Sequence, residues 1–122
     1  MNIESKTYSK ADGPLWSALL ATDDKELPRL LTAMLAPAGF SVQTVAIGDC
    51  PKVDPREYVI VFYDGDLQKP VSGQNAAVVV ISPTDAVAMY DAGADLVVER
   101  PLIANVLMAK VRSVLRRYGI RI

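Results

Sequence analysis

The chain has 122 residues, of which 51% are hydrophobic and 22% charged, and this composition is typical of one globular domain with a real core. The formal net charge is −1, and a single cysteine with no histidine excludes an internal disulfide, a Cys/His zinc site and any histidine-based triad. A free thiol fits a cytoplasmic location, and no apolar run approaches the length of a membrane-spanning helix.

The charge is unevenly distributed along the chain. Residues 110–122 carry five basic side chains and no acidic one, and the rest of the chain carries eight basic and fourteen acidic side chains. A basic end is one feature of nucleic-acid-binding proteins. Cations at the C-terminal end of a helix also complement the helix dipole. We expect the second explanation to hold, with no direct contact between this chain and DNA.

The first predicted elements are a tail, a strand and a helix. Residues 1–14 are polar around a Gly-Pro break and predict a flexible tail. The apolar segment 15–22 predicts a strand, and a helix follows over about 25–36. We expect Asp24 to cap this helix and Gly39 to end it. The apolar residues at helical spacing, which predict its buried face, are Leu27, Leu30, Leu31, Met34 and Leu35.

The middle of the chain predicts strands joined by short connections. Strands are expected over 41–47, over the apolar run that ends at Asp64, and over 77–81. The segments 48–57 and 65–76 are rich in turn-forming residues and show no helical period, so neither predicts a helix. One face of the sheet is therefore expected to be thinly covered, with apolar surface left to bury in a partner.

The last third of the chain predicts a helix, a strand and a helix. Thr84 or Asp85 is expected to cap a short helix that ends at Gly93. A strand over 96–98 and a helix over about 102–117 follow. The apolar stripe expected on the last helix is Ile103, Val106, Leu107, Val111, Val114 and Leu115. This element order predicts an α/β protein with a parallel sheet.

Polar side chains follow four of the predicted strands, at the ends that meet at one edge of a parallel sheet. Carboxylates gathered there would form an oxygen-rich site suited to Mg²⁺. A hydroxyl and a cation beside them would stabilise a phosphoryl group, so the pattern predicts an aspartate that attacks a phosphoryl donor. These residues are Asp23, Asp24, Asp64, Asp66, Ser82 and Arg100.

Five segments occur in order along the chain: ALLATDD, AGF, YVIVFYD, VVVIS and AGADLVVERP. With them, residues 16–119 resemble the receiver domain of two-component response regulators, and the last helix is similar to that of the OmpR/PhoB winged-helix subfamily. The resemblance implies a flavodoxin-like (CheY-like) α/β fold, with a five-stranded parallel sheet of order 2-1-3-4-5 and with helices 2 and 3 shortened or missing. Residues 15–119 would form the receiver domain and 120–122 the start of a linker.

The resemblance also implies roles for the acidic residues. Asp64 would be the phospho-acceptor, which receives its phosphoryl group from a sensor histidine kinase. Asp23 and Asp24 would hold Mg²⁺ together with Asp64 and the backbone carbonyl of Asp66. The chain would be a phospho-acceptor that at most phosphorylates and dephosphorylates itself, and not an enzyme acting on other substrates.

At three positions this sequence departs from the family pattern or allows more than one interpretation. Arg100 stands where the family has a lysine, and its flat guanidinium would either contact the phosphoryl oxygens or pair with the acids and close the site. Val97 occupies the position of the family's switch aromatic residue. Ser82 matches the switch hydroxyl, with Thr84 as a rival. The Arg100–Pro101 peptide bond matches one that is usually cis.

The implied output is homodimerisation through the face formed by helix 4, strand 5 and helix 5. DNA would be bound only through a C-terminal effector domain that is missing from this chain, and no membrane is involved. The alternative is a pseudo-receiver, an interaction and dimerisation module that never takes phosphate. A third interpretation rests on Asp64-Gly65-Asp66, which resembles the DxD signature of haloacid-dehalogenase-like phosphatases. That motif belongs on the first strand of its family, and this chain is too short for the remaining catalytic loops.

Overall fold

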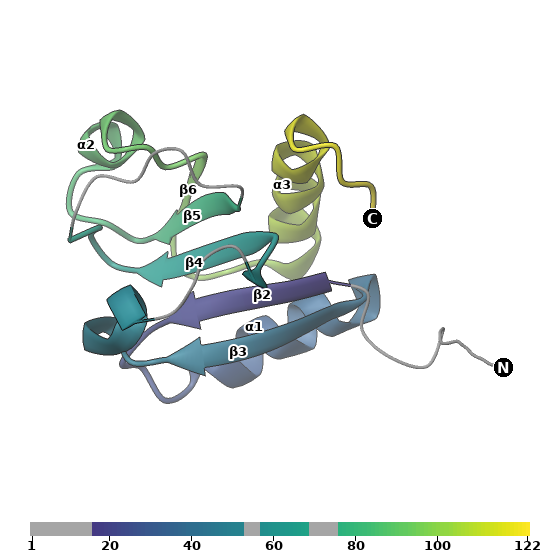
Figure 1. Cartoon of the computed structure of the whole chain (residues 1–122), viewed down its shortest axis with the longest axis horizontal. Helices are drawn as coiled ribbons and strands as arrows, with labels where there is room; N and C mark the ends of the chain where they lie inside the picture. The colour runs from purple at the N-terminus through teal and green to yellow at the C-terminus, as the bar shows by residue number, and fades with distance from the viewer. Residues whose placement is uncertain (1–15, 53–56, 69–75) are drawn as a thin grey trace, which may run out of the picture.

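The computed structural model describes residues 16–52, 57–68 and 76–122 (Figure 1). These residues form a five-stranded sheet in the order β3-β2-β4-β5-β6, and every neighbouring pair is parallel. The sequence prediction of a parallel α/β sheet with strand order 2-1-3-4-5 is confirmed. All carboxyl ends of the strands therefore lie at one edge of the sheet, where the arrowheads point in Figure 1.

The elements of the described residues follow the predicted order. They are β2 (Trp16–Ala21), α1 (Leu27–Leu35), η2 (Ala36–Ala38), β3 (Phe40–Val45), η3 (Ile47–Lys52), β4 (Ile60–Asp64), β5 (Ala77–Ile81), α2 (Ala86–Asp91), β6 (Leu96–Val98) and α3 (Ala104–Arg117). Only η3, a short 3₁₀ segment, lies where no helix was expected. The segment 65–76, which was also expected to lack a helix, falls mostly outside the described residues.

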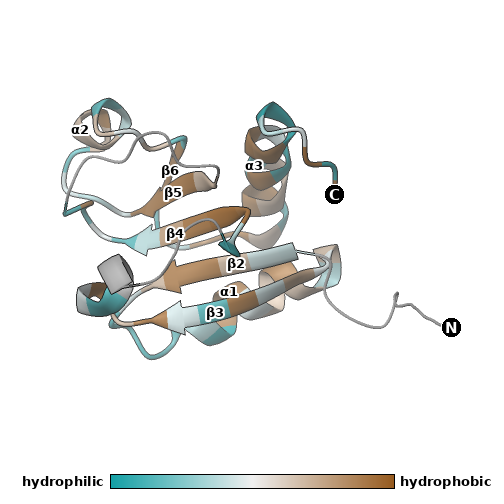
Figure 2. Cartoon of the chain, in the orientation of Figure 1, coloured by the Kyte–Doolittle hydropathy of each residue, from teal (hydrophilic) through white to brown (hydrophobic). Residues whose placement is uncertain are grey.

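The main core lies between the sheet and the helices α1 and α3. Alternate residues of the strands point to this face, among them Leu20, Phe62 and Val79, and all three are fully buried. They pack with Leu31 of α1 and Val111 of α3. The apolar character of β4 and β5 is visible in Figure 2. Burying each large side chain contributes roughly 1.5–3 kcal/mol, so this face supplies most of the hydrophobic stabilisation.

The opposite face of the sheet carries two smaller clusters instead of one core. Leu19 and Val61 pack with Tyr58 in one of them, and Val80 packs with Met89 of α2 in the other. These side chains are buried, so the expectation that apolar strand surface is left exposed on a thin face is wrong. Among the described residues, Tyr58, which precedes β4, and Met89 of α2 help to cover these strands.

The apolar stripes of α1 and α3 are narrower than predicted. Leu30 is 45% exposed, because the buried residues of α1 follow a spacing of four that leaves it on the solvent side. Ile103 is 57% exposed, because it precedes the first turn of α3 in an extended conformation. Val106 is 45% exposed, and it points away from the buried stripe that begins at Leu107.

The ends of the helices correct one predicted cap and confirm others. Glu26, not Asp24, occupies the N-cap of α1 and makes no side-chain cap bond, while Asp24 Oδ1 accepts the Glu26 N–H at 2.8 Å. Asp85 caps α2 by accepting the Ala88 N–H, as one of the two predicted alternatives. Gly39 has φ 94° and ends η2, which continues α1 for one more short turn.

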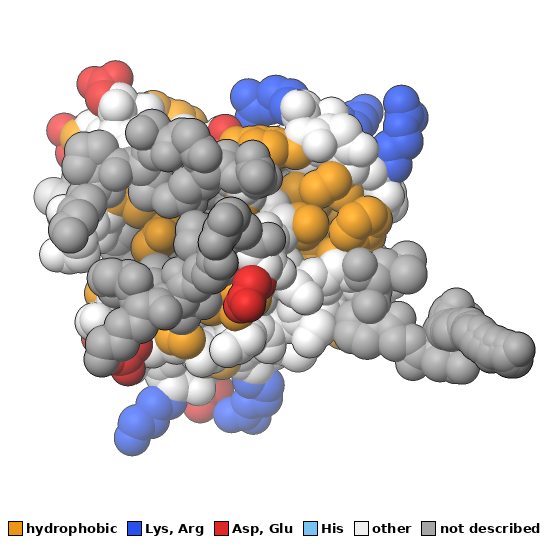
Figure 3. Space-filling model, viewed as in Figure 1, with side chains coloured by type: hydrophobic (Ala, Val, Ile, Leu, Met, Phe, Trp, Pro, Cys, Tyr) orange, Lys and Arg blue, Asp and Glu red, His pale blue; other side chains and the backbone are white. Residues whose placement is uncertain are grey.

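The basic residues of the C-terminal segment lie on α3 and beyond it. Arg116 and Arg117 are in the last turn of the helix, where they complement the helix dipole. Lysine and arginine side chains gather near this end in Figure 3. Ile120 and Ile122 fold back and pack against the main core. No helix among the described residues is long and apolar enough to cross a membrane.

Candidate functional site

The carboxyl edge of the sheet brings together residues that are far apart in the sequence. β2 and β4 are neighbours in register, with Ala21 beside Tyr63, so Thr22 and Asp64 end adjacent strands. β4 and β5 are also neighbours, with Asp64 beside Ile81, and Ser82 follows. Arg100 comes two residues after the end of β6. The parallel topology therefore places an acid, two hydroxyls and a cation at one edge.

Arg100 forms a bidentate ion pair with Asp64. Its Nη1 donates to Asp64 Oδ1 at 2.8 Å, and its Nη2 donates to Asp64 Oδ2 at 3.1 Å. The Asp64 side chain is only 14% exposed, while that of Arg100 is 39% exposed. Parallel charge-assisted bonds of this kind fix the geometry of the pair as well as its energy. Of the two roles left open for Arg100, the structure contains the pairing with the acids.

Arg100 also reaches the acid pair that follows β2. Its Nη2 lies 3.2 Å from Asp24 Oδ2, so one guanidinium bridges Asp24 and Asp64. Two carboxylates this close would repel each other without a cation between them. The Arg100 charge therefore offsets the repulsion between the two carboxylates at this edge.

Thr22 is a site residue that was missed in the sequence. It is only 4% exposed, and its Oγ1 donates to Asp64 Oδ2 at 2.7 Å while accepting the Asp24 N–H at 2.9 Å. The available signal was a hydroxyl residue that directly precedes the acid pair at the end of an otherwise apolar strand. Every oxygen of the Asp64 carboxylate thus accepts at least one hydrogen bond.

The surroundings of Asp64 shift its proton affinity. Burial by itself would raise the pKa of Asp64, but the hydrogen bonds from Arg100 and Thr22 and the charge of Arg100 outweigh it. The pKa of Asp64 therefore lies below its ordinary value. The hydrogen bond to Asp64 raises the pKa of Arg100 in turn, so both partners are charged near neutral pH.

Ser82 contacts the backbone of Arg100. Its Oγ accepts the Arg100 N–H at 2.9 Å, and its own N–H donates to the Val98 carbonyl at 2.7 Å. Ser82 adopts φ 47°, a left-handed conformation that is uncommon for a residue with a side chain. The peptide bond between Arg100 and Pro101 is cis, as the resemblance implied. Ser82 thus helps to position the loop that carries the guanidinium.

Solved structures with the same fold include receiver domains. A response regulator receiver domain protein from Clostridium thermocellum matches with a TM-score of 0.69 and 17% identity, covering 86% of this chain and 98% of that chain. A sensor protein from Polaromonas sp. JS666 matches with a TM-score of 0.68 and 21% identity, covering 86% of this chain and 99% of that chain. The chain has the CheY-like receiver fold.

Longer proteins also contain this fold. The chain matches full-length FixJ from B. japonicum with a TM-score of 0.64 and 17% identity, covering 86% of this chain and 60% of that chain. No family model matches the chain, and no curated protein matches it in sequence. The likeness therefore concerns the fold, and membership of the OmpR/PhoB subfamily stays a prediction.

The remaining acids at the carboxyl edge of the sheet, Asp23 and Asp66, accept hydrogen bonds from loop residues. Asp23 Oδ1 accepts the Ile47 N–H at 3.2 Å, and Asp66 Oδ1 accepts the Thr84 N–H at 2.7 Å. Thr84 thus contacts Asp66 through its backbone N–H. Asp66 is held toward the loop before α2 by this hydrogen bond.

The side chains at the carboxyl edge of the sheet can be compared with what a magnesium ion needs as ligands. Within the described part of the chain, no group of three or more Asp, Glu, His or Cys residues is arranged to hold a metal. Arg100 instead lies between Asp24 and Asp64, the two acids that approach each other. A guanidinium in that position repels a second cation, so in this conformation the residues do not fit Mg²⁺.

Proposed function

We propose that this chain is a receiver-type interaction module that works without phosphorylation. The observation that carries the proposal is the bidentate ion pair between Arg100 and Asp64, the residue at the phospho-acceptor position. The guanidinium neutralises the carboxylate and holds the edge of the sheet in one arrangement. The module would then present a constant surface to its partners instead of a switched one.

The chemistry of phosphoryl transfer explains why the ion pair opposes it. An aspartate nucleophile needs an unshielded oxygen lone pair directed at phosphorus. Here Asp64 Oδ1 accepts a hydrogen bond from Arg100, and Oδ2 accepts hydrogen bonds from Arg100 and Thr22. Bond formation to phosphorus draws negative charge away from the carboxylate and so weakens these charge-assisted bonds, which raises the barrier.

The test is the reaction of the whole chain with acetyl phosphate and Mg²⁺, followed by intact-protein mass spectrometry. We expect the wild-type protein to remain unmodified. The variant Arg100→Lys keeps the charge but has no planar fork, so it should free one oxygen of Asp64 and allow modification. Asp64→Asn in the Arg100→Lys background is the control and should abolish that modification. A wild-type protein that gains a phosphoryl group on Asp64 would contradict the proposal.

A second candidate is a receiver that accepts a phosphoryl group on Asp64 from a sensor histidine kinase. One observation favours it: Asp24, Asp64 and Ser82 converge with a cation at the same edge of the sheet. The Arg100 side chain is also 39% exposed, which gives it solvent-accessible space into which to move. Modification of the wild-type protein, lost in Asp64→Asn, would establish this candidate and replace the first.

The proposed partner surface is the α2–β6–α3 face, through which we propose that the chain forms a homodimer. Val87 and Tyr90 of α2 and Val106 of α3 are exposed apolar side chains of these elements. α2 and α3 both contact β6. Burial of such side chains against a second copy would drive association. Binding to DNA would belong to an effector domain outside this chain.

Sedimentation equilibrium tests the dimer. Val87→Asp should weaken association by placing a charge in the apolar interface. Leu30→Asp is a matched control, because Leu30 is an exposed apolar residue of α1, outside the α2–β6–α3 face. Equal effects of the two variants, or a wild-type protein that stays monomeric at high concentration, would refute the proposed surface.

A further inference from the structure

Thr22 is the only buried polar side chain among the described residues, and its hydroxyl donates to Asp64 beside Arg100. We propose that Thr22 is a positioning residue, which holds Asp64 in place independently of Arg100 and slows the reaction of Asp64 when the arginine is replaced. The inference rests on the proposed function, because it concerns how Asp64 is kept from reacting. It adds a second restraint, supplied by a different strand.

The hydroxyl of Thr22 can bind in only one way. A hydroxyl has a single proton to donate, and the Asp24 N–H must donate, so Thr22 Oγ1 accepts from Asp24 at 2.9 Å. The proton of the hydroxyl is then directed to Asp64 Oδ2, 2.7 Å away. Because Asp64 is ionised near neutral pH, it accepts this bond as a charge-assisted one.

The two restraints on Asp64 come from different parts of the fold. Thr22 directly follows β2, which pairs with β4 in the sheet, so its position is fixed by the backbone ladder. Arg100 reaches Asp64 from the loop between β6 and α3, through a long side chain that is 39% exposed. The short, buried threonine is therefore the more rigid of the two partners.

A purely structural role for Thr22 is the alternative. The bond from the Asp24 N–H to Thr22 Oγ1 spans two residues and stabilises the turn after β2 whatever Asp64 does. That role would make the threonine important for stability only. The bond to Asp64 spans 42 residues and joins two strands, and a role for Thr22 on Asp64 depends on this second bond alone.

The reactivity of Asp64 separates the two roles. Acetyl phosphate with Mg²⁺ is the probe: an Asp64 oxygen forms a bond to phosphorus, the bond from phosphorus to the acetate oxygen breaks, and acetate leaves with the electron pair. The proteins are Arg100→Lys alone and the same variant combined with Thr22→Val or Thr22→Ser. We expect Thr22→Val to speed modification roughly tenfold over Arg100→Lys alone, as the loss of one charge-assisted bond predicts. Thr22→Ser keeps the hydroxyl and should leave the rate unchanged.

Three results would overturn the inference. The first is an equal rate, including no modification at all, for Arg100→Lys and Thr22→Val/Arg100→Lys. The second is a Thr22→Ser rate as high as the Thr22→Val rate. The third comes from thermal unfolding, which does not need the Arg100→Lys change and therefore applies even if Thr22→Val combined with Arg100→Lys folds poorly. Thr22→Val should lower the unfolding midpoint more in the wild-type chain than in Asp64→Ala, and equal losses would assign Thr22 to the turn alone.

The failure of this inference is distinguishable from the failure of the proposed function. Modification of the wild-type chain would refute a phosphorylation-independent module. The comparison between Thr22→Val and Thr22→Ser would still report, in the wild-type background, whether the hydroxyl restrains Asp64. Conversely, equal rates for the threonine variants would refute the positioning role while an unreactive wild-type chain preserved the proposed function.

Discussion

Two aspartates at opposite edges of the sheet tie the C-terminal part of the chain to the strands. At the carboxyl edge, Asp64 accepts hydrogen bonds from Arg100 and Thr22. At the amino edge, Asp95 Oδ2 accepts the Tyr118 hydroxyl and the Val78 N–H, each at 2.8 Å. Each of these two carboxylates accepts a hydrogen bond from one hydroxyl, but only Asp64 is also paired with a cation through both of its oxygens.

The difference shows how the surroundings of a carboxylate decide its use. The donors to Asp95 are a backbone amide within β5 and a phenol just after α3, which fasten two elements together. The donors to Asp64 are the side chains of Thr22 and Arg100, so the contacts at that edge can change when a single residue is replaced. The amino edge is therefore expected to be structural, and the carboxyl edge to be the site where function is altered.

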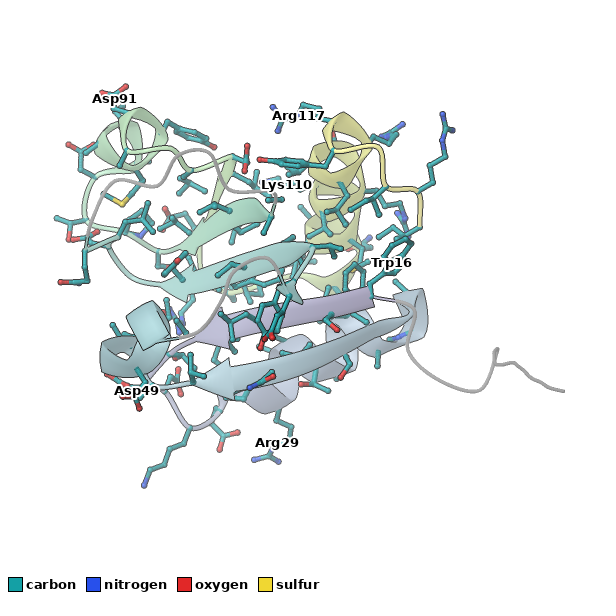
Figure 4. All side chains as sticks on the ribbon, in the orientation of Figure 1. Trp16, Arg29, Asp49, Asp91, Lys110 and Arg117 are labelled. Atoms are coloured by element: carbon teal, nitrogen blue, oxygen red, sulfur yellow. The ribbon has the colours of Figure 1, made fainter. Side chains whose placement is uncertain are left out.

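The largest effect is expected from Asp95→Ala. This change leaves the N–H of the buried Val78 and the Tyr118 hydroxyl without their acceptor, which should lower the free energy of unfolding by about 2–3 kcal/mol. Urea denaturation measures it. Asp91→Ala is the control, because Asp91 is exposed on α2 and points away from the sheet (Figure 4). Equal destabilisation by Asp95→Ala and Asp91→Ala would contradict a structural role for Asp95 at the amino edge.

Arg100→Ala should destabilise the protein less, by about 1–2 kcal/mol. The change leaves Asp64 partly buried without its cation, but the exposure of Arg100 lets solvent screen the lost interaction. Arg29→Ala serves as the control, because Arg29 pairs with Glu26 on the surface of α1, where both side chains are 78% exposed. The control should cost no more than about 0.5 kcal/mol. If the two arginines proved equivalent, the ion pair with Asp64 would not stabilise the carboxyl edge.

Acid pH should act on the carboxyl edge. The pKa of Asp64 is lowered from 3.8, so its stabilising contribution is complete above that value and is lost as the pH falls further toward its folded-state pKa. Asp64→Asn should flatten this part of the stability profile, measured as the free energy of unfolding from pH 6 downward. An unchanged acid dependence in the variant would show that Asp64 is not held ionised in the folded protein.

Alkaline pH should act on the amino edge, with the smallest effect. Burial, the hydrogen bond to Asp95 and its negative charge raise the pKa of Tyr118 from 10.0 to about 12. The contribution of Tyr118 is therefore complete below pH 10 and is lost as the pH rises from 10 toward 12.

Tyr118→Phe tests this alkaline contribution. It should cost about 0.5–1 kcal/mol at neutral pH, as one hydrogen bond to a charged acceptor is lost near the surface, and it should remove the alkaline loss. The control Tyr90→Phe, on α2, removes a hydroxyl that accepts the Val97 N–H and should leave the alkaline loss in place. Stability curves recorded between pH 9 and pH 12 measure both. An alkaline loss that persists in Tyr118→Phe would assign it to another group.

The sequence determined the strands and the convergence of Asp64, Ser82 and Arg100, because apolar runs that end in polar residues define buried parallel strands. The order of the strands followed from the resemblance to receiver domains. It did not decide which apolar residues of a helix face the sheet. Leu30 and Val106 have apolar side chains of the kind found in cores, but each lies outside the buried face of its helix. It also left open whether Arg100 would contact a phosphoryl group or the acids.

Only the tertiary structure decided the contacts of the carboxyl edge, because hydrogen bonds depend on distances of a few tenths of an ångström between residues far apart in sequence. The buried hydroxyl of Thr22 meets Asp64 because β2 and β4 lie side by side in register. The guanidinium of Arg100 meets both Asp24 and Asp64 because β6 ends at the same edge. The residue types predicted an acidic phosphoryl site, and their packing formed an ion pair in its place.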